Sequence, residues 1–379
     1  MKLATRLVHF DTSPKDPFHP MATPIYQTAT FEQEHADSFG EYDYSRSGNP
    51  TRRVLEDHVA RLENGTRSFA FSSGMAAIAT VTHLLKPGDE ILADWDLYGG
   101  TSRLFNRLHA HSGITVRTAD FTHPDAIAAH ITPATRMIYA ESPTNPLLRV
   151  LDLQAIGNIA QQHNLLFCVD NSTMSPYLQN PLDLGAHLVV HSATKFLCGH
   201  SDVTGGLIVV KDETLANEIY TLQNAEGSAL GPFDCFLLLR GLKTLKLRMD
   251  AQQHSAVSIA NFLSAHPKVQ AIHYPGLPDH PQHQVQLTQA RGSGSVLSFT
   301  AGSAASAKAI AENTRLFKIA VSFGSVNSTI SIPFGMSHAS VPIEQRAARG
   351  IPNDLLRLSI GIEDTDDLLE DLATQLDAL

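Results

Sequence analysis

The stretch His191-Ser192-Ala193-Thr194-Lys195 directly follows the apolar run Leu188-Val189-Val190, and Gly205-Gly206 come shortly after it. A lysine just past a buried strand, behind two hydroxyl side chains, suits a particular chemistry. The amine can form a Schiff base with an aldehyde cofactor, and the hydroxyl groups can bind a phosphate of that cofactor. Because Ser-x-Thr-Lys also occurs on solvated surfaces, the rest of the chain has to decide between the two interpretations.

Two further segments supply what such a cofactor needs. Asp170 ends the apolar run Leu165-Leu166-Phe167-Cys168-Val169, where a pyridinium nitrogen requires a carboxylate. Ser73-Gly74-Met75 opens a helical segment, where backbone N–H groups can receive a phosphate. Asp170 in Asp-Asn-Ser is equally typical of a helix N-cap, and Ser-Ser-Gly on its own is more often a plain N-cap. Taken with Lys195, these segments predict a pyridoxal phosphate (PLP) enzyme.

The composition is that of a soluble globular protein with room for two domains, since 379 residues include 43% hydrophobic and 17% charged ones. The formal net charge of −10 argues against a general nucleic-acid partner, which usually requires a basic face. No apolar run approaches the roughly 20 residues that a membrane span requires. The first ten residues, MKLATRLVHF, lack the long apolar core of a signal peptide. We therefore expect neither a nucleic-acid nor a membrane partner.

The three cysteines are Cys168, Cys198 and Cys235, an odd number, and the first and last of them lie in apolar runs. They are typical of reduced, mostly buried thiols in a reducing compartment, so we expect a cytoplasmic location. Cys198, beside Gly199-His200, is a minor candidate for a nucleophile, because Lys195 already accounts for the local chemistry.

The chain divides into three parts. Residues 1–50 are rich in Pro, Thr, Ser and Asp, and they predict an extended arm that packs on another subunit. Residues 51–62 have helical spacing. After them, strand patterns (68–71, 90–93, 114–117, 136–140 and runs ending at Asp170 and His191) alternate with helical ones (75–85, from Gly99, 152–163). This alternation predicts an α/β domain over 51–245, with a mainly parallel sheet that binds its ligand beyond the carboxyl ends of the strands.

The pattern changes near Leu237, where one long helical stretch carries Leu238, Leu242, Leu245 and Leu247. Shorter strands over 296–299 and 355–360 and a closing helix from Asp364 follow. These features predict a smaller C-terminal α/β domain over 246–379.

Other residues are candidates for binding. The Gly74 and Met75 N–H groups and the Ser192 and Thr194 hydroxyls suit a phosphate dianion, to which Arg46 of the arm can add a guanidinium. Tyr98, before Gly99-Gly100, is placed to stack on a ring, although a core tyrosine at a turn has the same pattern.

Arg357 is a charged residue inside an apolar strand. A buried arginine needs a partner, and both the carboxylate of an amino-acid substrate and a structural ion pair are open. His280 and His283 have metal-like spacing in a Pro-rich loop, but no Cys or second His pair is near them, so we expect no metal site.

At this point the chain resembles a known family, the Cys/Met metabolism PLP enzymes. The motifs that carry the resemblance run in one order over nearly the whole chain: Tyr44-Ser-Arg-Ser-Gly-Asn-Pro-Thr51, Ser73-Gly-Met75, Glu141-Ser-Pro-Thr-Asn-Pro146, Ser192-Ala-Thr-Lys195, Gly199-His-Ser-Asp202, Arg240-Gly-Leu-Lys-Thr244 and Arg357-Leu-Ser-Ile-Gly-Ile-Glu363. The resemblance implies the aspartate-aminotransferase type I fold, with a mainly parallel seven-stranded sheet and a smaller C-terminal domain. It also implies homotetramers built from tight dimers.

The resemblance assigns roles to single residues. It implies that Lys195 is the Schiff-base lysine and main catalytic residue, assisted by Tyr98, which stacks on the cofactor ring, and that Asp170 pairs with the ring nitrogen. The residues implied to hold the phosphate are Ser73, Gly74, Met75, Ser192 and Thr194, together with Tyr44 and Arg46 of the neighbouring subunit. Those implied to bind the substrate carboxylate are Arg357, Asn145 and Ser322.

Within the family, several segments look most like plant-type cystathionine β-lyases: Leu222-Gln-Asn-Ala-Glu-Gly-Ser228, Pro278-Asp-His-Pro281 and Phe323-Gly-Ser-Val326. Asn327 stands where γ-acting relatives often carry a glutamate, and Gly100 where methionine γ-lyases carry a cysteine. This resemblance implies β-elimination of L-cystathionine to homocysteine, pyruvate and ammonia. The alternatives are a cystathionine γ-lyase or γ-synthase and, more remotely, a non-catalytic binding protein on the same fold.

Overall fold

Two β-sheets organise the chain in the computed structural model, which describes residues 1–12, 16–337, 339, 346 and 349–379. The larger sheet contains β1 (Arg67–Phe71), β2 (Glu90–Asp94), β3 (Thr115–Ala119), β4 (Thr135–Glu141), β5 (Leu166–Asp170), β6 (Leu188–Ser192) and β7 (Gly206–Val210). The smaller sheet contains β8 (Ala271–His273), β9 (Val296–Thr300), β10 (Lys318–Ile319), β11 (Thr329–Ser331) and β12 (Leu355–Ser359).

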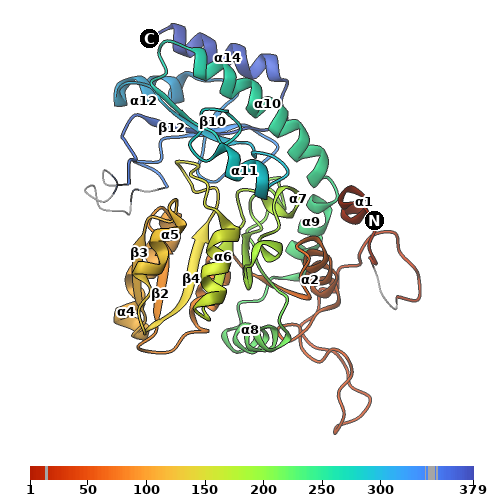
Figure 1. The fold of residues 1–379 in the computed structure, drawn as a ribbon. Helices are drawn as coiled ribbons and strands as arrows, with labels where there is room; N and C mark the ends of the chain where they lie inside the picture. The colour runs from red at the N-terminus through yellow and green to blue at the C-terminus, as the bar shows by residue number, and fades with distance from the viewer. Residues whose placement is uncertain (13–15, 338, 340–345, 347–348) are drawn as a thin grey trace.

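The helices lie around these sheets (Figure 1). Up to β7 they are α1 (Leu3–Val8), α2 (Pro50–Leu62), α3 (Gly74–Thr82), α4 (Gly99–Ser112), α5 (Pro124–Ile127), α6 (Leu153–Gln162) and α7 (Ser175–Leu178), with short 3₁₀ turns at Ala128–His130 and Pro181–Leu184. After β7 come α8 (Glu213–Glu226), α9 (Pro232–Leu242), α10 (Leu245–Ala265), α11 (His283–Gln289), α12 (Ala304–Asn313) and α14 (Thr365–Asp377).

Within the described residues, the larger sheet has seven strands in the order β1-β7-β6-β5-β4-β2-β3. Every pair from β6 to β3 is parallel, whereas β7 is antiparallel to both of its neighbours. The chain returns from β6 to β7 through residues 193–205, which include Lys195 and contain no crossover helix. The mainly parallel seven-stranded sheet expected from the resemblance is therefore confirmed.

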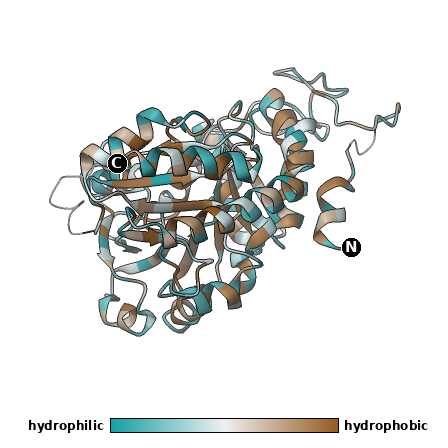
Figure 2. Ribbon diagram, turned by 90° about the horizontal axis from the view of Figure 1, so that it is seen from above, coloured by the Kyte–Doolittle hydropathy of each residue, from teal (hydrophilic) through white to brown (hydrophobic). Residues whose placement is uncertain are grey.

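Helices cover both faces of this sheet, as its continuous apolar strands require. The core on one face includes residues of α3, α4 and α8, and the core on the other includes residues of α2, α6 and α9. Figure 2 shows brown, hydrophobic strands surrounded by helices that mix both colours. The carboxyl ends of β4, β5 and β6 point toward the part of the molecule formed by the smaller sheet (Figure 1). Among the described helices, none is long and apolar enough to cross a membrane.

The expected long helix from Leu237 is wrong, because the structure has two helices, α9 and α10, that meet at Lys243-Thr244. Gly241 packs so closely that an added Cβ would lie 2.3 Å from the carbonyl oxygen of Cys198. At this junction Arg248 donates to the carbonyl oxygens of Gly241 and Phe196, both at 2.8 Å. Leu247, on the second of these helices, is 70% exposed.

Helix α10 joins the two parts of the molecule. Leu245 and Met249 belong to the core of the larger sheet, whereas Ile259 and Leu263 belong to the core of the smaller one. The predicted boundary at 245/246 thus falls at the start of a helix that both cores share, and that boundary stays a prediction.

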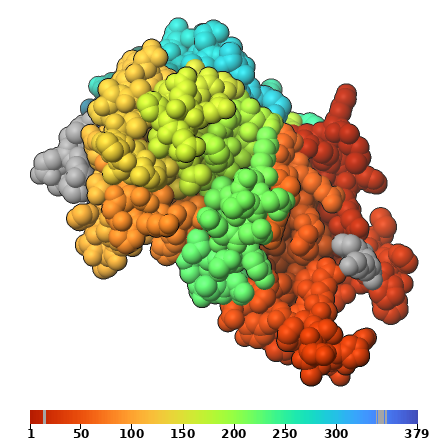
Figure 3. Space-filling view, turned by 60° about the horizontal axis from the view of Figure 1, so that its bottom comes forward, coloured from red at the N-terminus to blue at the C-terminus, as the bar shows by residue number. Residues whose placement is uncertain are grey.

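The arm begins with the helix α1, which the sequence pattern did not indicate, and the bounds of the arm stay a prediction. Leu7 of α1 is buried against the larger core. Beyond it, the arm projects from the body in Figure 3. Three of its apolar side chains are strongly exposed: Phe18 at 89%, Met21 at 92% and Phe39 at 71%.

Candidate active site

A cavity of about 200 Å³ lies at the carboxyl ends of β4, β5 and β6, beside the start of α3. It brings together most residues that the sequence singled out: Ser73, Gly74, Met75, Tyr98, Asn145, Asp170, Ser192, Thr194 and Lys195. The other residues that line it are Ile78, Glu141, Ser172, Thr204 and Phe323.

Lys195 reaches this cavity from the turn that follows β6, where its N–H donates to the carbonyl oxygen of Ser192 at 3.2 Å. Its Nζ donates to Ser322 Oγ at 2.5 Å and lies 4.8 Å from the centre of the Phe323 ring. Burial and the positive charge of Arg357 lower the pKa of the Lys195 amine to about 8, while Asp170 opposes the shift. A larger share of this amine is therefore neutral near pH 7 than in an ordinary lysine, which suits a nucleophile and base.

Asp170 ends β5 and is 6% exposed. Its Oδ1 accepts the N–H of Ser172 at 3.0 Å, and the helix that follows starts only at Ser175, so Asp170 is not that helix's N-cap. Burial raises the pKa of Asp170, whereas hydrogen bonds from Ser172 and the charges of His191 and Lys195 lower it. A carboxylate buried this deeply needs a cationic partner in the cavity, and a protonated ring nitrogen fits that requirement.

The start of α3 forms the phosphate end of the cavity. Ser73 caps the helix by accepting the N–H of Ala76 at 3.1 Å, and the first-turn N–H groups of Gly74 and Met75 have no partner within the helix. A Cβ on Gly74 would lie 3.0 Å from that of Ser192, so glycine allows the helix start to approach the hydroxyl groups. Among the described residues that line this cavity there is no arginine. The donors fit a phosphate, but one chain leaves the dianion without a guanidinium.

Arg357 lies on β12, beside the cavity, and is 2% exposed. It donates to Asn145 Oδ1 at 2.8 Å and to the carbonyl oxygen of Ser322 at 2.6 Å, while its Nε has no partner among the described residues. Burial lowers the pKa of Arg357 to about 10. No described carboxylate lies within salt-bridge distance of it, so the structural ion pair loses support and a substrate carboxylate is favoured.

Ser322 forms hydrogen bonds with both Lys195 and Arg357. Its hydroxyl accepts from the Lys195 amine, and its carbonyl oxygen accepts from the Arg357 guanidinium. Its φ of 80° lies in the left-handed region, which costs a residue other than glycine on the order of 1 kcal/mol. The two hydrogen bonds hold Ser322 in this strained conformation.

Tyr98 precedes α4 and is 37% exposed at the cavity, so it is not a core tyrosine. Its N–H donates to Glu141 Oε2 at 2.9 Å. Its ring lies over Gly100, where an added Cβ would be 2.4 Å from Tyr98 Cε1. Glycine at position 100 therefore gives the ring the room to face the cavity.

Three other residues lie outside the lining of this cavity. Tyr44 and Arg46 lie on the arm, where the Arg46 guanidinium stacks 5.2 Å from the centre of the Tyr44 ring and its Nε donates to Asn224 at 3.1 Å. Asn327 is exposed, so its side chain does not explain a preference for one substrate carbon.

Glu141 and Phe323 are among the five lining residues that the sequence reasoning did not propose for the site. Glu141 ends β4 directly opposite Asp170 in the sheet register. Like Asp170, it is a carboxylate at the end of an apolar strand, and that signal could have identified it. Phe323 was noted only as a subgroup feature, and nothing local shows that its ring faces Lys195.

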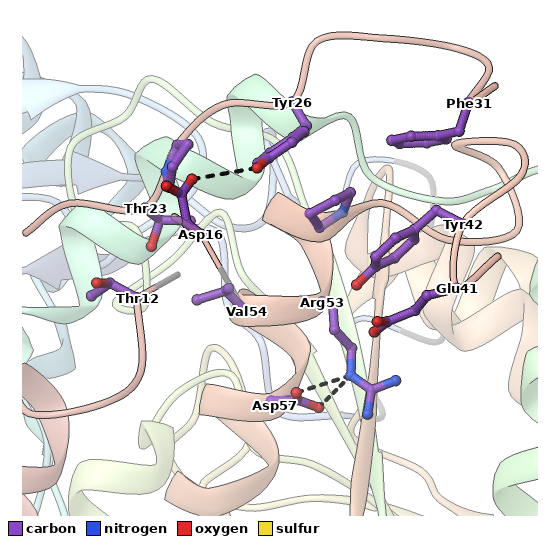
Figure 4. Close-up of a pocket in the computed structure, with 12 residues that line it drawn as sticks. Thr12, Asp16, Thr23, Tyr26, Phe31, Glu41, Tyr42, Arg53, Val54 and Asp57 are labelled. Carbon is purple, nitrogen blue, oxygen red and sulfur yellow. Dashed lines mark hydrogen bonds and ion pairs between the residues drawn. The ribbon is translucent and has the colours of Figure 1, made fainter. Parts of the chain in front are cut away.

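A larger cavity, of about 390 Å³, lies between the arm and α2 (Figure 4). Tyr26, Tyr42 and Val54 line it, and Arg53 donates to both carboxylate oxygens of Asp57 at 2.8 and 2.9 Å. No lysine is among the described residues that line it, so it does not provide the chemistry of the smaller cavity.

The structure also shows the surroundings of Cys198, the minor candidate for a nucleophile. Cys198 is buried, and its thiol donates to Asp202 at 3.2 Å. Burial and Asp202 raise the pKa of this thiol to about 12, which disfavours the reactive thiolate. His280 and His283 each contact the backbone, through Gln282 N and the carbonyl oxygen of Pro275.

Comparisons with known proteins identify the family of this chain. A model of the Cys/Met metabolism PLP-dependent enzymes matches residues 4–377. The chloroplastic cystathionine β-lyase of Arabidopsis thaliana is 53% identical over 98% of this chain and 80% of that protein. Cystathionine β-lyase MetC of Bacillus subtilis (strain 168) is 47% identical over 99% of this chain and 96% of that protein. The crystal structure of cystathionine γ-lyase from Lactobacillus plantarum complexed with L-serine has a TM-score of 0.97 at 44% identity, and covers 100% of this chain and 99% of that one. The chain belongs to the family of Cys/Met metabolism PLP-dependent enzymes.

Proposed function

We propose that this protein is a PLP-dependent carbon–sulfur lyase that cleaves L-cystathionine by β-elimination, yielding homocysteine, pyruvate and ammonia in methionine biosynthesis. The observation that carries this proposal is the meeting of Lys195, Asp170 and the Asn145–Arg357 pair around one cavity. Such a site can bind an amino acid by its carboxylate and move a proton at its Cα.

Each side chain has a distinct proposed part in that reaction. When bound, PLP supplies an aldehyde that condenses with amines and a protonated ring that accepts electron density from Cα. Asp170 holds the proton on the ring nitrogen, and Arg357 with Asn145 holds the substrate carboxylate. The Lys195 amine removes the Cα proton and then protonates the departing thiolate, while Tyr98 packs on the ring.

Two observations support cleavage at the β-carbon. Both β-lyases compared above are 47–53% identical to this chain over almost its whole length. Independently, Phe323 lies over Lys195 and lines the cavity, and it belongs to the segment that resembles plant-type β-lyases. β-Elimination needs one deprotonation at Cα, which Lys195 can perform, whereas γ-elimination needs a second one at Cβ.

The product assay tests this choice of carbon. Purified protein incubated with L-cystathionine is expected to release mostly pyruvate and homocysteine, because the thiolate leaves from the β-carbon. The 2-oxo acid is identified by chromatography, with the Lys195→Ala variant as the blank. Mostly 2-oxobutyrate with cysteine contradicts β-cleavage and leaves the family assignment intact.

The second candidate is a γ-acting enzyme of the same family. The 0.97 TM-score and 44% identity to the Lactobacillus plantarum γ-lyase favour it as the alternative. The same assay separates the two, since γ-cleavage gives 2-oxobutyrate. A non-catalytic binding protein has no support from a cavity that is lined by Lys195 and Asp170 and has Arg357 bonded to the lining residue Asn145.

We further propose a homotetramer built as a dimer of dimers, in which Tyr44 and Arg46 of one subunit complete the phosphate site of its neighbour. Within one described chain that phosphate end lacks an arginine, while Arg46 lies on a projecting arm with exposed apolar side chains (Figure 3). Burying such side chains against another subunit is favourable.

Mixing two inactive variants tests this sharing. One variant is Lys195→Ala and the other Arg46→Ala, refolded together so that hybrid dimers form. A hybrid keeps one site in which Lys195 and Arg46 are both intact, so random pairing is expected to restore about a quarter of the sites. Turnover of the mixture is measured against each variant alone. Hybrids that are confirmed by mass spectrometry but remain inactive contradict a shared site.

The location in the cytoplasm stays a proposal. Three buried free thiols support a reducing compartment, and the Arabidopsis relative is described as chloroplastic.

A further inference from the structure

Two carboxyl groups lie side by side at this cavity. Glu141 at the end of β4 is the register partner of Asp170 at the end of β5. Both line the cavity, and they are 4% and 6% exposed. Two neighbouring carboxylates in a buried site repel each other strongly, so such a pair tends to keep one proton.

The two groups differ in what surrounds them. Asp170 accepts the Ser172 N–H and lies near the positive charges of Lys195 and His191, all of which favour its ionised form. Around Glu141, the acidic neighbours are Asp170 on β5, Asp94 at the end of β2 and Asp96 just after it. The positive charge of Arg357 on β12 interacts with Glu141, Lys195 lines the same cavity, and the Tyr98 N–H before α4 donates to Glu141.

Asp94 and Asp96 are themselves fully buried, and two arginines act on them, Arg149, which lies 3.9 Å from Asp94, and Arg349. Burial raises the pKa of Asp96 and raises that of Asp94 to about 7. Burial and the charge of Asp170 raise the pKa of Glu141 well above its ordinary value. The Tyr98 N–H occupies Oε2, so Oε1 is the oxygen left to carry a proton.

We propose that Glu141 is held as the neutral acid in the working enzyme and serves as a positioning residue. Asp170 then stays ionised for the ring nitrogen, and Arg357 keeps its charge for the substrate carboxylate. An ionised Glu141 attracts the Arg357 guanidinium and repels an incoming carboxylate, so its ionisation weakens substrate binding more than it slows the chemical step. The inference rests on the proposed roles of Asp170 and Arg357, and it holds for β- and γ-cleavage alike.

The kinetic test is the Glu141→Gln variant of the holoenzyme. Its amide oxygen can still accept the Tyr98 N–H, but the side chain cannot ionise. At neutral pH we expect kcat and KM within about threefold of wild type, since a neutral group replaces a neutral group. On the alkaline side, wild-type KM rises up to about tenfold per pH unit once Glu141 ionises, and this rise is absent from the variant.

The control variant is Glu56→Gln. Glu56 is a carboxylate of α2 that also accepts a backbone N–H, from Ala70 at 2.8 Å, but it lies outside the cavity. Glu56→Gln is expected to keep the wild-type dependence of KM on pH. Loss of kcat/KM by about 100-fold or more in Glu141→Gln at neutral pH, with cofactor content and circular dichroism intact, shows that a carboxylate is required and overturns the proposal.

Infrared spectroscopy gives a readout that needs no turnover. The wild-type minus Glu141→Gln difference spectrum is expected to show the carbonyl stretch of a protonated carboxylic acid at neutral pH, and the band is expected to vanish as the pH rises. Labelling glutamate with ¹³C shifts the Glu141 band and separates it from any carbonyl band of protonated Asp94 or Asp96. A difference spectrum with only carboxylate bands overturns the proposal. A wrong product, or an active Lys195→Ala variant, instead points to failure of the proposed function.

Discussion

Replacing Lys195 by alanine is expected to lower kcat/KM for L-cystathionine by about 10³-fold or more. The variant loses both the amine that attaches the cofactor and the group that moves the proton at Cα, and proton transfer by one side chain is alone worth about 10²–10⁴-fold. The absorption band of the attached cofactor is expected to disappear with it. Steady-state kinetics and the absorption spectrum of the purified protein measure both effects.

The control for that prediction is Lys308→Ala. Lys308 is exposed on α12 and pairs with Glu312 at 3.7 Å, away from the cavity. Its loss is expected to leave both the spectrum and kcat/KM unchanged within about twofold, because exposed ion pairs contribute little. If Lys195→Ala keeps full turnover and the wild-type spectrum, Lys195 does not carry the cofactor.

Asp170→Asn is expected to lower kcat/KM by about 10²–10⁴-fold, because breaking a buried charge pair costs about 3–5 kcal/mol. Asparagine keeps the shape of the side chain but offers the ring nitrogen no negative charge. The nitrogen then loses its proton, and with it the capacity to stabilise charge at Cα. Turnover, cofactor affinity and the pH dependence of the cofactor spectrum report the change.

A matched substitution separates this effect from general destabilisation. Asp152 caps α6 by accepting the Ala155 N–H at 2.9 Å, and asparagine is an equally good cap. Asp152→Asn is expected to retain wild-type activity and stability. A folded Asp170→Asn variant whose kcat stays within threefold of wild type contradicts the proposed role of Asp170.

Much of the cavity could be anticipated because its residues follow short-range rules. Lys195 and Asp170 each stand at or just past the end of an apolar run, and parallel strands place such ends at one edge of a sheet. Ser73 and Gly74 carry the local signature of a helix start, which the structure confirms. Burial of a strand and capping of a helix depend on a few consecutive residues, so one sequence contains that information.

The break between α9 and α10 shows where local pattern fails. Leucines at helical spacing continue through residues 243 and 244, but the backbone at Gly241 packs directly on Cys198. The helix is interrupted beside this contact between residues 43 positions apart, where the local spacing predicts a continuous helix.

The sequence by itself determined the mainly parallel sheet, with Lys195 just past the carboxyl end of one strand and Asp170 at the carboxyl end of the neighbouring strand. Strand period, apolar runs and caps each depend on a few consecutive residues. Only the tertiary structure decided that Arg357 meets Asn145, 212 residues away in the chain, and that Glu141 stands opposite Asp170. Those neighbours are fixed by how two sheets and their helices pack into shared cores, and that packing depends on the whole chain at once.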